Sequence, residues 1–237
     1  MLRNLSSLSY PLPKSFKKIR LRRYFVILGI LLIINTIMSK KYIAEFIGTF
    51  TLSFIVLVAV AHKGGLPMAI PLIAGLTLAL FVYSIGSISG CHINPSVTIG
   101  QLSVGKISGK NALNYIIAQI LGAVGAIFVA KMLSIASPMS ASDFSSKAFL
   151  AEALGAFFFN FGIASVVYGK AKEQMSGLVV GGSLLLGVLI ASLSGASGIL
   201  NPAVALALNS LSVVYILAPI VGAILGFQVY RFVAEEK

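Results

Sequence analysis

Long runs of apolar residues, separated by short polar breaks, dominate the chain. A helix needs about 20 mostly apolar residues to span the hydrocarbon core of a bilayer. Six runs reach this length, and glycine, lysine, serine or asparagine residues mark the breaks between them. The pattern predicts six transmembrane helices, at residues 42–61, 67–88, 111–133, 148–168, 177–194 and 212–233.

Two further apolar runs, residues 94–104 and 201–208, are too short to cross a bilayer. Each begins with Asn-Pro. Asparagine is a preferred helix N-cap, and proline is preferred at the first helical position. Asn-Pro is also a common turn signal, so a single pair could mark only a bend. Two pairs, each opening a short apolar run, indicate two re-entrant half-helices instead.

The chain contains an internal repeat. Glu45 and Asn94 recur 107 residues later as Glu152 and Asn201, and the offset falls to 100 in the last helix. Each copy holds three spans, an odd number, so the copies insert in opposite orientations and their half-helices meet N-terminus to N-terminus near the midplane. The predicted fold is an all-α membrane protein, with six transmembrane helices and two re-entrant half-helices in an inverted repeat. The two copies are residues 41–133 and 148–233.

Composition excludes several other classes of protein. Of the 237 residues, 58% are hydrophobic and 10% are charged, whereas a soluble domain carries about 25% charged residues. The net charge of +12 would suit a nucleic-acid binder only on a soluble basic face, which this chain lacks. One cysteine excludes a disulfide framework, and no residues stand at metal-ligand spacing. We therefore expect no nucleic-acid partner, no metal and no cofactor.

Basic residues in the short loops set the expected orientation. With six spans and a start near Met38 on the inside, eight basic residues fall inside and three outside. This bias predicts that both termini of the core are cytoplasmic, and a start near Met38 is typical of a protein of the cell (inner) membrane. The inside set is Lys40, Lys41, Lys106, Lys110, Lys170, Lys172, Arg231 and Lys237, and the outside set is Lys63, Lys131 and Lys147.

The meeting point of the half-helices has a defined chemistry. Each helix N-terminus carries about half an elementary positive charge, and the side-chain amides of Asn94 and Asn201 add hydrogen-bond donors. A neutral hydroxylic molecule can accept these hydrogen bonds, whereas a cation or hydronium ion meets repulsion and loses hydration. The sequence thus predicts a pore for small uncharged solutes that excludes cations and protons.

Three segments carry a resemblance to a known family: Ser89–Thr98 (SGCHINPSVT), Leu200–Ala203 (LNPA) and Ala44–Thr49 (AEFIGT). They resemble the two signature loops and the first-helix motif of the aquaporin and aquaglyceroporin (major intrinsic protein) family, over about residues 40–233. The resemblance implies one pore per subunit, a homotetramer in the lipid bilayer, and water, glycerol or urea as solutes. The implied pore constriction is Asn94, Pro95, Ser96, Asn201, Pro202 and Ala203, with Ser96 replacing the family's alanine.

The selectivity filter implied by the resemblance is unusual. The family usually has an arginine after its second Asn-Pro-Ala, where this chain has Val204. The other filter positions fall on Ala74, on Val188 or Leu189, and on Gly198. Such a filter is small and apolar, so we expect passage of solutes larger than water, with proton exclusion resting mainly on the half-helix dipoles.

Four further residues have two interpretations each. Glu45 and Glu152 are acidic residues within spans, where an unpaired carboxylate is costly. Either they relay protons, or they accept hydrogen bonds from the irregular backbone before each half-helix, which their repeat symmetry favours. His92 is a pore-lining group or pH sensor, or a satisfied loop histidine. Cys91 lines the pore or is a buried small hydrophobe.

The first 37 residues differ from the rest. Seven basic residues lie ahead of a 14-residue apolar run, Tyr24–Ile37, which is short for a span. The segment is an over-extended gene start or signal, a cytoplasmic interfacial anchor, or a seventh span. The predicted domains are a basic extension, residues 1–37, and a channel domain, residues 38–237.

Three other functions compete with a passive channel, and one of them is a scaffold with a closed pore, which the apolar filter would allow. Inverted repeats with broken helices also build ion-coupled secondary transporters, which would normally need charged or coordinating side chains at the midplane. A membrane enzyme would need a catalytic cluster, and the sequence offers no grouped His or Asp set, no activated serine and no phosphate-cradling loop. The sequence therefore favours a channel, and not an enzyme.

Overall fold

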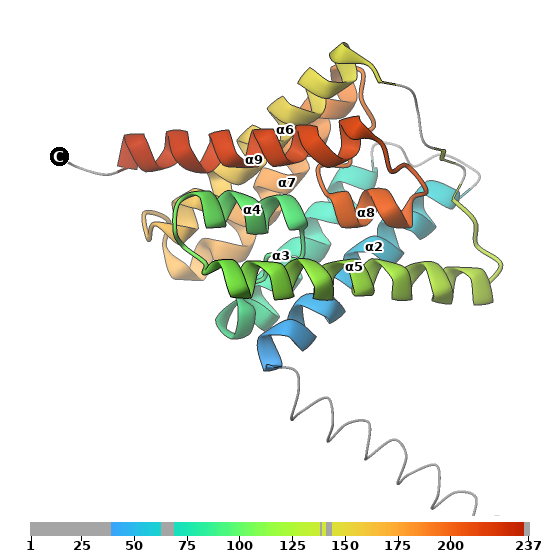
Figure 1. Ribbon diagram of the computed structural model, residues 1–237, viewed down its shortest axis with the longest axis horizontal. Helices are drawn as coiled ribbons and strands as arrows, with labels where there is room; N and C mark the ends of the chain where they lie inside the picture. The colour runs from blue at the N-terminus through green and yellow to red at the C-terminus, as the bar shows by residue number, and fades with distance from the viewer. Residues whose placement is uncertain (1–38, 63–68, 138, 141–143, 235–237) are drawn as a thin grey trace, which may run out of the picture. The chain divides into compact units, whose positions relative to one another are not determined.

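The computed structural model describes residues 39–62, 69–137, 139–140 and 144–234, which form helices joined by loops (Figure 1). Six of these helices are long and apolar enough to cross a membrane, which confirms the predicted spans. The predicted extension, residues 1–37, lies outside the described residues, as do Lys63 and Lys237 of the orientation argument. The six are α2 (Lys40–Ala61), α3 (Ala69–Ser89), α5 (Gly109–Met132), α6 (Ser146–Val167), α7 (Ser176–Leu193) and α9 (Val213–Ala234), with a 3-10 turn, η1 (Glu173–Met175), before α7.

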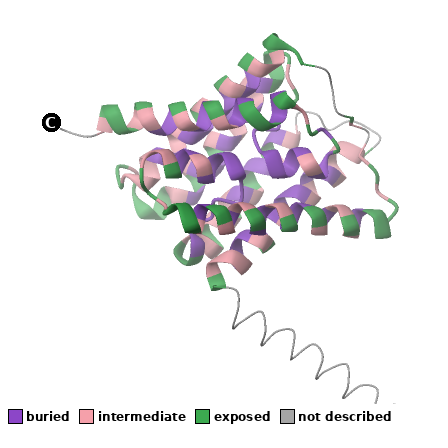
Figure 2. Ribbon diagram, in the orientation of Figure 1, coloured by how far each residue is buried: buried purple, intermediate pink, exposed green. Residues whose placement is uncertain are grey.

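The long helices have the dimensions and the outer surface of membrane spans. With 18 to 24 residues each, they extend about 27–36 Å at 1.5 Å per residue, close to the thickness of a bilayer's hydrocarbon core. Exposed residues recur along these helices (Figure 2). On α5 they include the large apolar side chains of Leu113, Ile117 and Phe128. Such a surface favours aggregation in water and is stable against lipid. The chain is therefore an integral membrane protein.

Two short helices, α4 (Pro95–Ser103) and α8 (Pro202–Ala207), lie between α5 and α9 (Figure 1). In each, the asparagine before the proline caps the helix, and its side chain accepts a hydrogen bond from the N–H group two residues later, at 2.8 Å and 3.0 Å. The predicted ranges, 94–104 and 201–208, included these caps, so the helices themselves are shorter. Most residues of both helices are buried, as Figure 2 shows.

The two repeats have the same order of elements. The helices α2 to α5 correspond to α6 to α9, so each repeat contributes three spans and one half-helix. In the first repeat Gly122 brings α5 against the Phe46 carbonyl of α2, and in the second Gly222 brings α9 against the Ala153 carbonyl of α6. The helices α3 and α7 pack on each other and join the repeats. These paired contacts agree with the predicted inverted repeat.

The crossing of α3 and α7 depends on Gly75 and Gly181, where a Cβ atom would run into the opposite helix. We expect Gly181→Ala to lower the free energy of unfolding by about 1–3 kcal/mol, because it overpacks a close contact. Gly182→Ala is the matched control, since a Cβ there meets no atom within 4 Å. It should raise stability by about 0.5–1 kcal/mol, the usual gain from removing a helical glycine. Thermal unfolding in detergent, followed by circular dichroism, compares the two variants, and equal stabilities would contradict this packing.

Candidate functional site

An irregular segment with unusual backbone conformations precedes each half-helix. Ile93 and Leu200, directly before the two asparagines, have φ angles of +39° and +54°. The repeat-related Cys91 and Gly198 also have positive φ angles, of +50° and +67°. A β-branched residue in this region is an outlier, and such strain costs of order 1–3 kcal/mol. It persists only where the surroundings hold it, and both Ile93 and Leu200 are fully buried.

Two glutamates hold these segments. Glu45 of α2 accepts hydrogen bonds from the N–H groups of His92, at 2.9 Å, and Ile93, at 2.6 Å. Glu152 of α6 does the same for the two residues before Asn201, each at 2.9 Å. Both carboxylates are fully buried, and each oxygen accepts at least one hydrogen bond. These are the contacts that the supporting interpretation of the glutamates requires.

The first repeat surrounds its glutamate with more polar side chains than the second. Glu45 also accepts hydrogen bonds from the Ser89 hydroxyl, at 2.7 Å, and the Gln119 amide, at 2.8 Å. The Gln119 amide also donates to the Thr98 hydroxyl, at 3.0 Å. A side-chain network therefore supports the first half-helix, whereas backbone groups are the partners seen at Glu152. The corresponding positions of the second repeat hold Ala196, Ala205 and Pro219.

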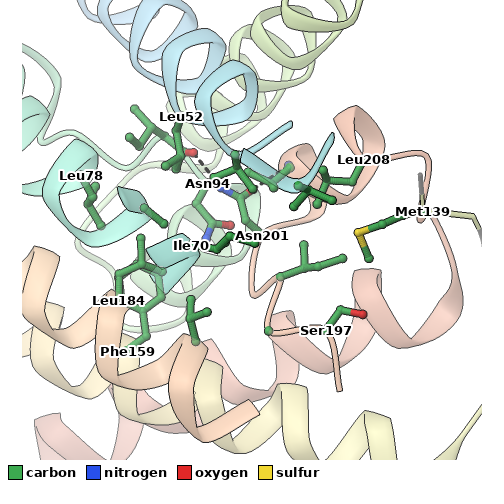
Figure 3. A pocket seen from close by; sticks show the side chains of 18 of the residues that line it. Leu52, Ile70, Leu78, Asn94, Met139, Phe159, Leu184, Ser197, Asn201 and Leu208 are labelled. Atoms are coloured by element: carbon green, nitrogen blue, oxygen red, sulfur yellow. Dashed lines mark hydrogen bonds between the residues drawn. The ribbon is translucent and has the colours of Figure 1, made fainter. Parts of the chain in front are cut away.

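The two half-helices are joined by reciprocal hydrogen bonds at their N-termini. The Asn94 amide donates to the Leu200 carbonyl at 3.0 Å, and the Asn201 amide donates to the Ile93 carbonyl at 3.1 Å. In both Ile93 and Leu200, the N–H group donates to the glutamate of the same repeat. The carbonyl of each accepts a hydrogen bond from the asparagine of the opposite repeat. Figure 3 shows the two asparagine side chains beside each other. The strained residues therefore link the two repeats at the ends of the half-helices.

The two residues after each asparagine do not line the cavity as the asparagine does. Ser96 and Ala203 are fully buried, and neither they nor the two prolines line the cavity among the described residues. The predicted constriction thus separates into two asparagines at the cavity and four residues behind them, because the first helical turn packs into the protein. Ser96 adds a contact that Ala203 cannot, since its hydroxyl lies 2.9 Å from the Asn94 side-chain oxygen and 3.2 Å from the Leu200 carbonyl.

A cavity of about 70 Å³ runs past the asparagines. This is room for several water molecules, at about 10–15 Å³ each on the same measure. All four predicted filter residues line it: Ala74, Val188, Gly198 and Val204. His92 also lines the cavity, whereas Leu189 and Cys91 are not among its described lining residues. In the view of Figure 3, other side chains lie on both sides of the asparagine pair, with Leu78, Leu184 and Phe159 on one side and Met139, Ser197 and Leu208 on the other.

Several lining residues were not predicted from the sequence. Leu52 and Phe159 occupy equivalent positions in the two repeats, 107 residues apart. Each stands seven residues after the glutamate of its helix. Residues seven positions apart lie on the same face of a helix. The two glutamates and the repeat could therefore have identified Leu52 and Phe159 as residues that face the site. Met139 comes from the loop between α5 and α6, and no pattern in the sequence indicated it.

The cavity wall is mostly apolar and carries no charged side chain among the described residues that line it. Its polar side chains are the two asparagines, His92 and Ser197. The His92 ring forms a hydrogen bond with the Thr98 hydroxyl at 3.1 Å, and the Ser197 hydroxyl forms one with the Tyr215 hydroxyl at 2.8 Å. The electrostatic features of the site are therefore two helix N-termini and two amides, in an uncharged surrounding.

The fold and this site define a class: integral membrane proteins built as an inverted repeat, with two half-helices meeting at a central cavity. The chain belongs to the Major intrinsic protein family, whose model matches residues 33–230. It is 38% identical to "Glycerol uptake facilitator protein-like 6" of Lactiplantibacillus plantarum, over 83% of this chain and 99% of that one. It is 32% identical to "Aquaporin AqpM" of Methanothermobacter marburgensis, over 84% and 99%. The solved aquaglyceroporin from Plasmodium falciparum shares the fold, with a TM-score of 0.62 and 24% identity over 82% of this chain and 95% of that one.

Proposed function

We propose that this protein is a passive transmembrane channel for water and small uncharged solutes of the size of glycerol or urea. The observation that carries the proposal is the meeting of two asparagine-capped helix N-termini at an uncharged cavity. The names of its relatives, a glycerol uptake facilitator-like protein and an aquaporin, support the same function. Transport of this kind needs no cofactor and no chemical step.

The asparagines supply the hydrogen bonds that a passing solute loses from water. Each amide has two N–H groups, and one of them is occupied by the carbonyl of the opposite repeat. The second N–H is the donor that a hydroxyl or carbonyl oxygen of the solute accepts. A cation gains nothing from these donors and is repelled by the two partial positive charges of the helix ends. The channel therefore excludes cations and protons.

The filter position of the cavity favours solutes larger than water. Val204 stands on α8 one turn after Asn201, and it is apolar and almost completely buried. Ala74 and Val188 complete an apolar wall around the same cavity. Small side chains without a cation leave a wider neck, so the size limit is set above that of water.

The uncharged cavity favours a channel over an ion-coupled transporter. A coupling ion needs carboxylate or carbonyl ligands, and both intramembrane carboxylates are occupied by backbone N–H groups away from the cavity.

The distribution of basic residues supports an orientation in the membrane. We propose that the ends of α2 and α9 that bear Lys40, Lys41 and Arg231 face the cytoplasm, in the cell (inner) membrane. A homotetramer with one pore in each subunit completes the proposed assembly.

Stopped-flow light scattering of proteoliposomes tests the proposed function. In osmotic gradients of glycerol, vesicles with the protein should equilibrate faster than empty vesicles, with a lower activation energy and no dependence on an ion or proton gradient. Glycerol and water rates equal to those of empty vesicles would contradict a channel. A flux that requires an ion gradient would instead support the transporter.

A further inference from the structure

One sulfur-containing residue, Met139, is among the described residues that line the cavity, and Figure 3 shows its side chain with the others. Cys91 is buried and does not line the cavity in the part of the chain that the structure describes. Met132 and Met175, at the ends of α5 and η1, are exposed and do not line it there either. A solute in the cavity therefore meets a single thioether along the described wall.

Hydrogen bonds fasten Met139 to the end of the second half-helix. The Ser137 hydroxyl donates to the carbonyl of Leu208, the C-cap of α8, at 2.8 Å. The Met139 N–H group donates to the Ser137 oxygen at 3.2 Å. The Met139 side chain is partly buried and packs against the hydrophobic core. These contacts hold the thioether in the cavity wall, although the residue comes from a loop.

Hydrogen peroxide belongs to the class of solutes that the proposed channel admits, because it is uncharged, larger than water and smaller than glycerol. It also reacts with thioethers. The sulfur lone pair attacks one peroxide oxygen, so that an S–O bond forms and the O–O bond breaks. The departing hydroxide takes the proton of the transferred oxygen and leaves as water. The sulfur is thereby oxidised by two electrons to a sulfoxide, and the peroxide is reduced.

We propose that Met139 is an oxidation site for hydrogen peroxide inside the channel, and that its sulfoxide restricts the passage of larger solutes. This inference rests on the proposed channel function and adds a regulation of the same site. The sulfoxide oxygen takes up about the space of one water molecule, in a cavity of about 70 Å³ that holds only several. It also turns an apolar part of the wall into a hydrogen-bond acceptor, which retains a solute hydroxyl. Both effects slow glycerol more than water.

Stopped-flow measurements of wild-type proteoliposomes before and after peroxide treatment test the proposal. Catalase removes the excess peroxide, and mass spectrometry of the peptides reports the oxygen added at each methionine. Once Met139 is oxidised, the protein-dependent glycerol permeability should fall several-fold, and the water permeability should fall less.

Two variants separate Met139 from the rest of the chain, and each is compared with its own permeability before treatment. Met139→Leu has a similar apolar volume and no sulfur, so peroxide should leave its glycerol permeability unchanged. Met175→Leu is the matched control, because Met175 is exposed and outside the described lining. Its glycerol permeability should fall as that of the wild-type protein does. Both variants also carry Cys91→Ala, which removes the chain's one thiol.

Oxidised Met139 with unchanged glycerol permeability would overturn the inference and leave the channel function standing. Unmodified Met139 beside fully oxidised Met175 would do the same, as would an equal loss of permeability in Met139→Leu. Absence of protein-dependent glycerol flux before any treatment would overturn the proposed function instead. Oxidation and flux of the wild-type protein decide the question even if a variant does not fold.

Discussion

Replacing Glu152 with leucine is expected to unfold the second half-helix and to abolish transport. The carboxylate accepts hydrogen bonds from the N–H groups of Ile199 and Leu200, each at 2.9 Å, and Leu200 has a φ angle of +54°. Without an acceptor, two backbone donors are left unpaired in a buried site and the strained segment loses its support. Hydrogen bonds to a charged group contribute about 1.5–3 kcal/mol each, so the expected loss of stability is about 3–6 kcal/mol.

Thermal unfolding in detergent and glycerol flux of proteoliposomes measure this effect together. Glu152→Gln keeps one acceptor oxygen and should lie between the wild-type protein and Glu152→Leu in both measurements. Glu173→Leu is the control, because Glu173 is an exposed acidic residue of η1 and its loss should change neither quantity. A stable, conducting Glu152→Leu variant would show that the carboxylate does not hold the segment.

Replacing Val204 with arginine is expected to reduce glycerol flux by about 10-fold or more and water flux by less. The cavity has a volume of about 70 Å³, and an arginine side chain at this lining position would take up much of it. It would also add a cation close to the positive ends of two helices. A narrow passage excludes the larger solute first, since water needs only about one seventh to one fifth of this volume.

Stopped-flow measurements of water and glycerol permeability separate the effect of side-chain size at position 204 from the effect of its charge, when a second variant is included. Val204→Met is comparably long and uncharged, so it should reduce glycerol flux by occlusion without adding a cation. The predicted order of glycerol permeability is wild type, then Val204→Met, then Val204→Arg. Equal losses of water and glycerol, or no loss of either, would mean that Val204 does not line the narrow part of the passage.

The sequence was sufficient to predict the helices and the centre of the site, because both depend on local patterns. Apolar runs of about 20 residues require spans in lipid, and an Asn-Pro pair fixes where a short helix begins. The repeat then required the two pairs to meet, and the structure joins Asn94 and Asn201 to each other's repeat. The candidate filter positions came from the family resemblance together with counting along the helices, which left Val188 and Leu189 open; Val188 lines the cavity.

What the sequence could not give depends on contacts between distant segments. The positive φ angles of Ile93 and Leu200 are imposed by a glutamate on one side and an asparagine on the other, and nothing in their own residue types indicates them. The burial of Ser96 behind Asn94 depends on how α4 packs against its neighbours. Met139 reaches the cavity from a loop, where no periodicity exists to reveal an inward face.

Cysteine block of transport tests the central claim most directly, namely that solute passes along the cavity beside the two half-helix ends. In a Cys91→Ala background, Val204→Cys places a thiol on the cavity wall, and Leu206→Cys places one on the same half-helix away from the described lining. Mercuric ion should remove most of the protein-dependent glycerol flux of the first variant and leave that of the second unchanged. If mass spectrometry shows Val204→Cys fully labelled while its flux persists, the passage lies elsewhere.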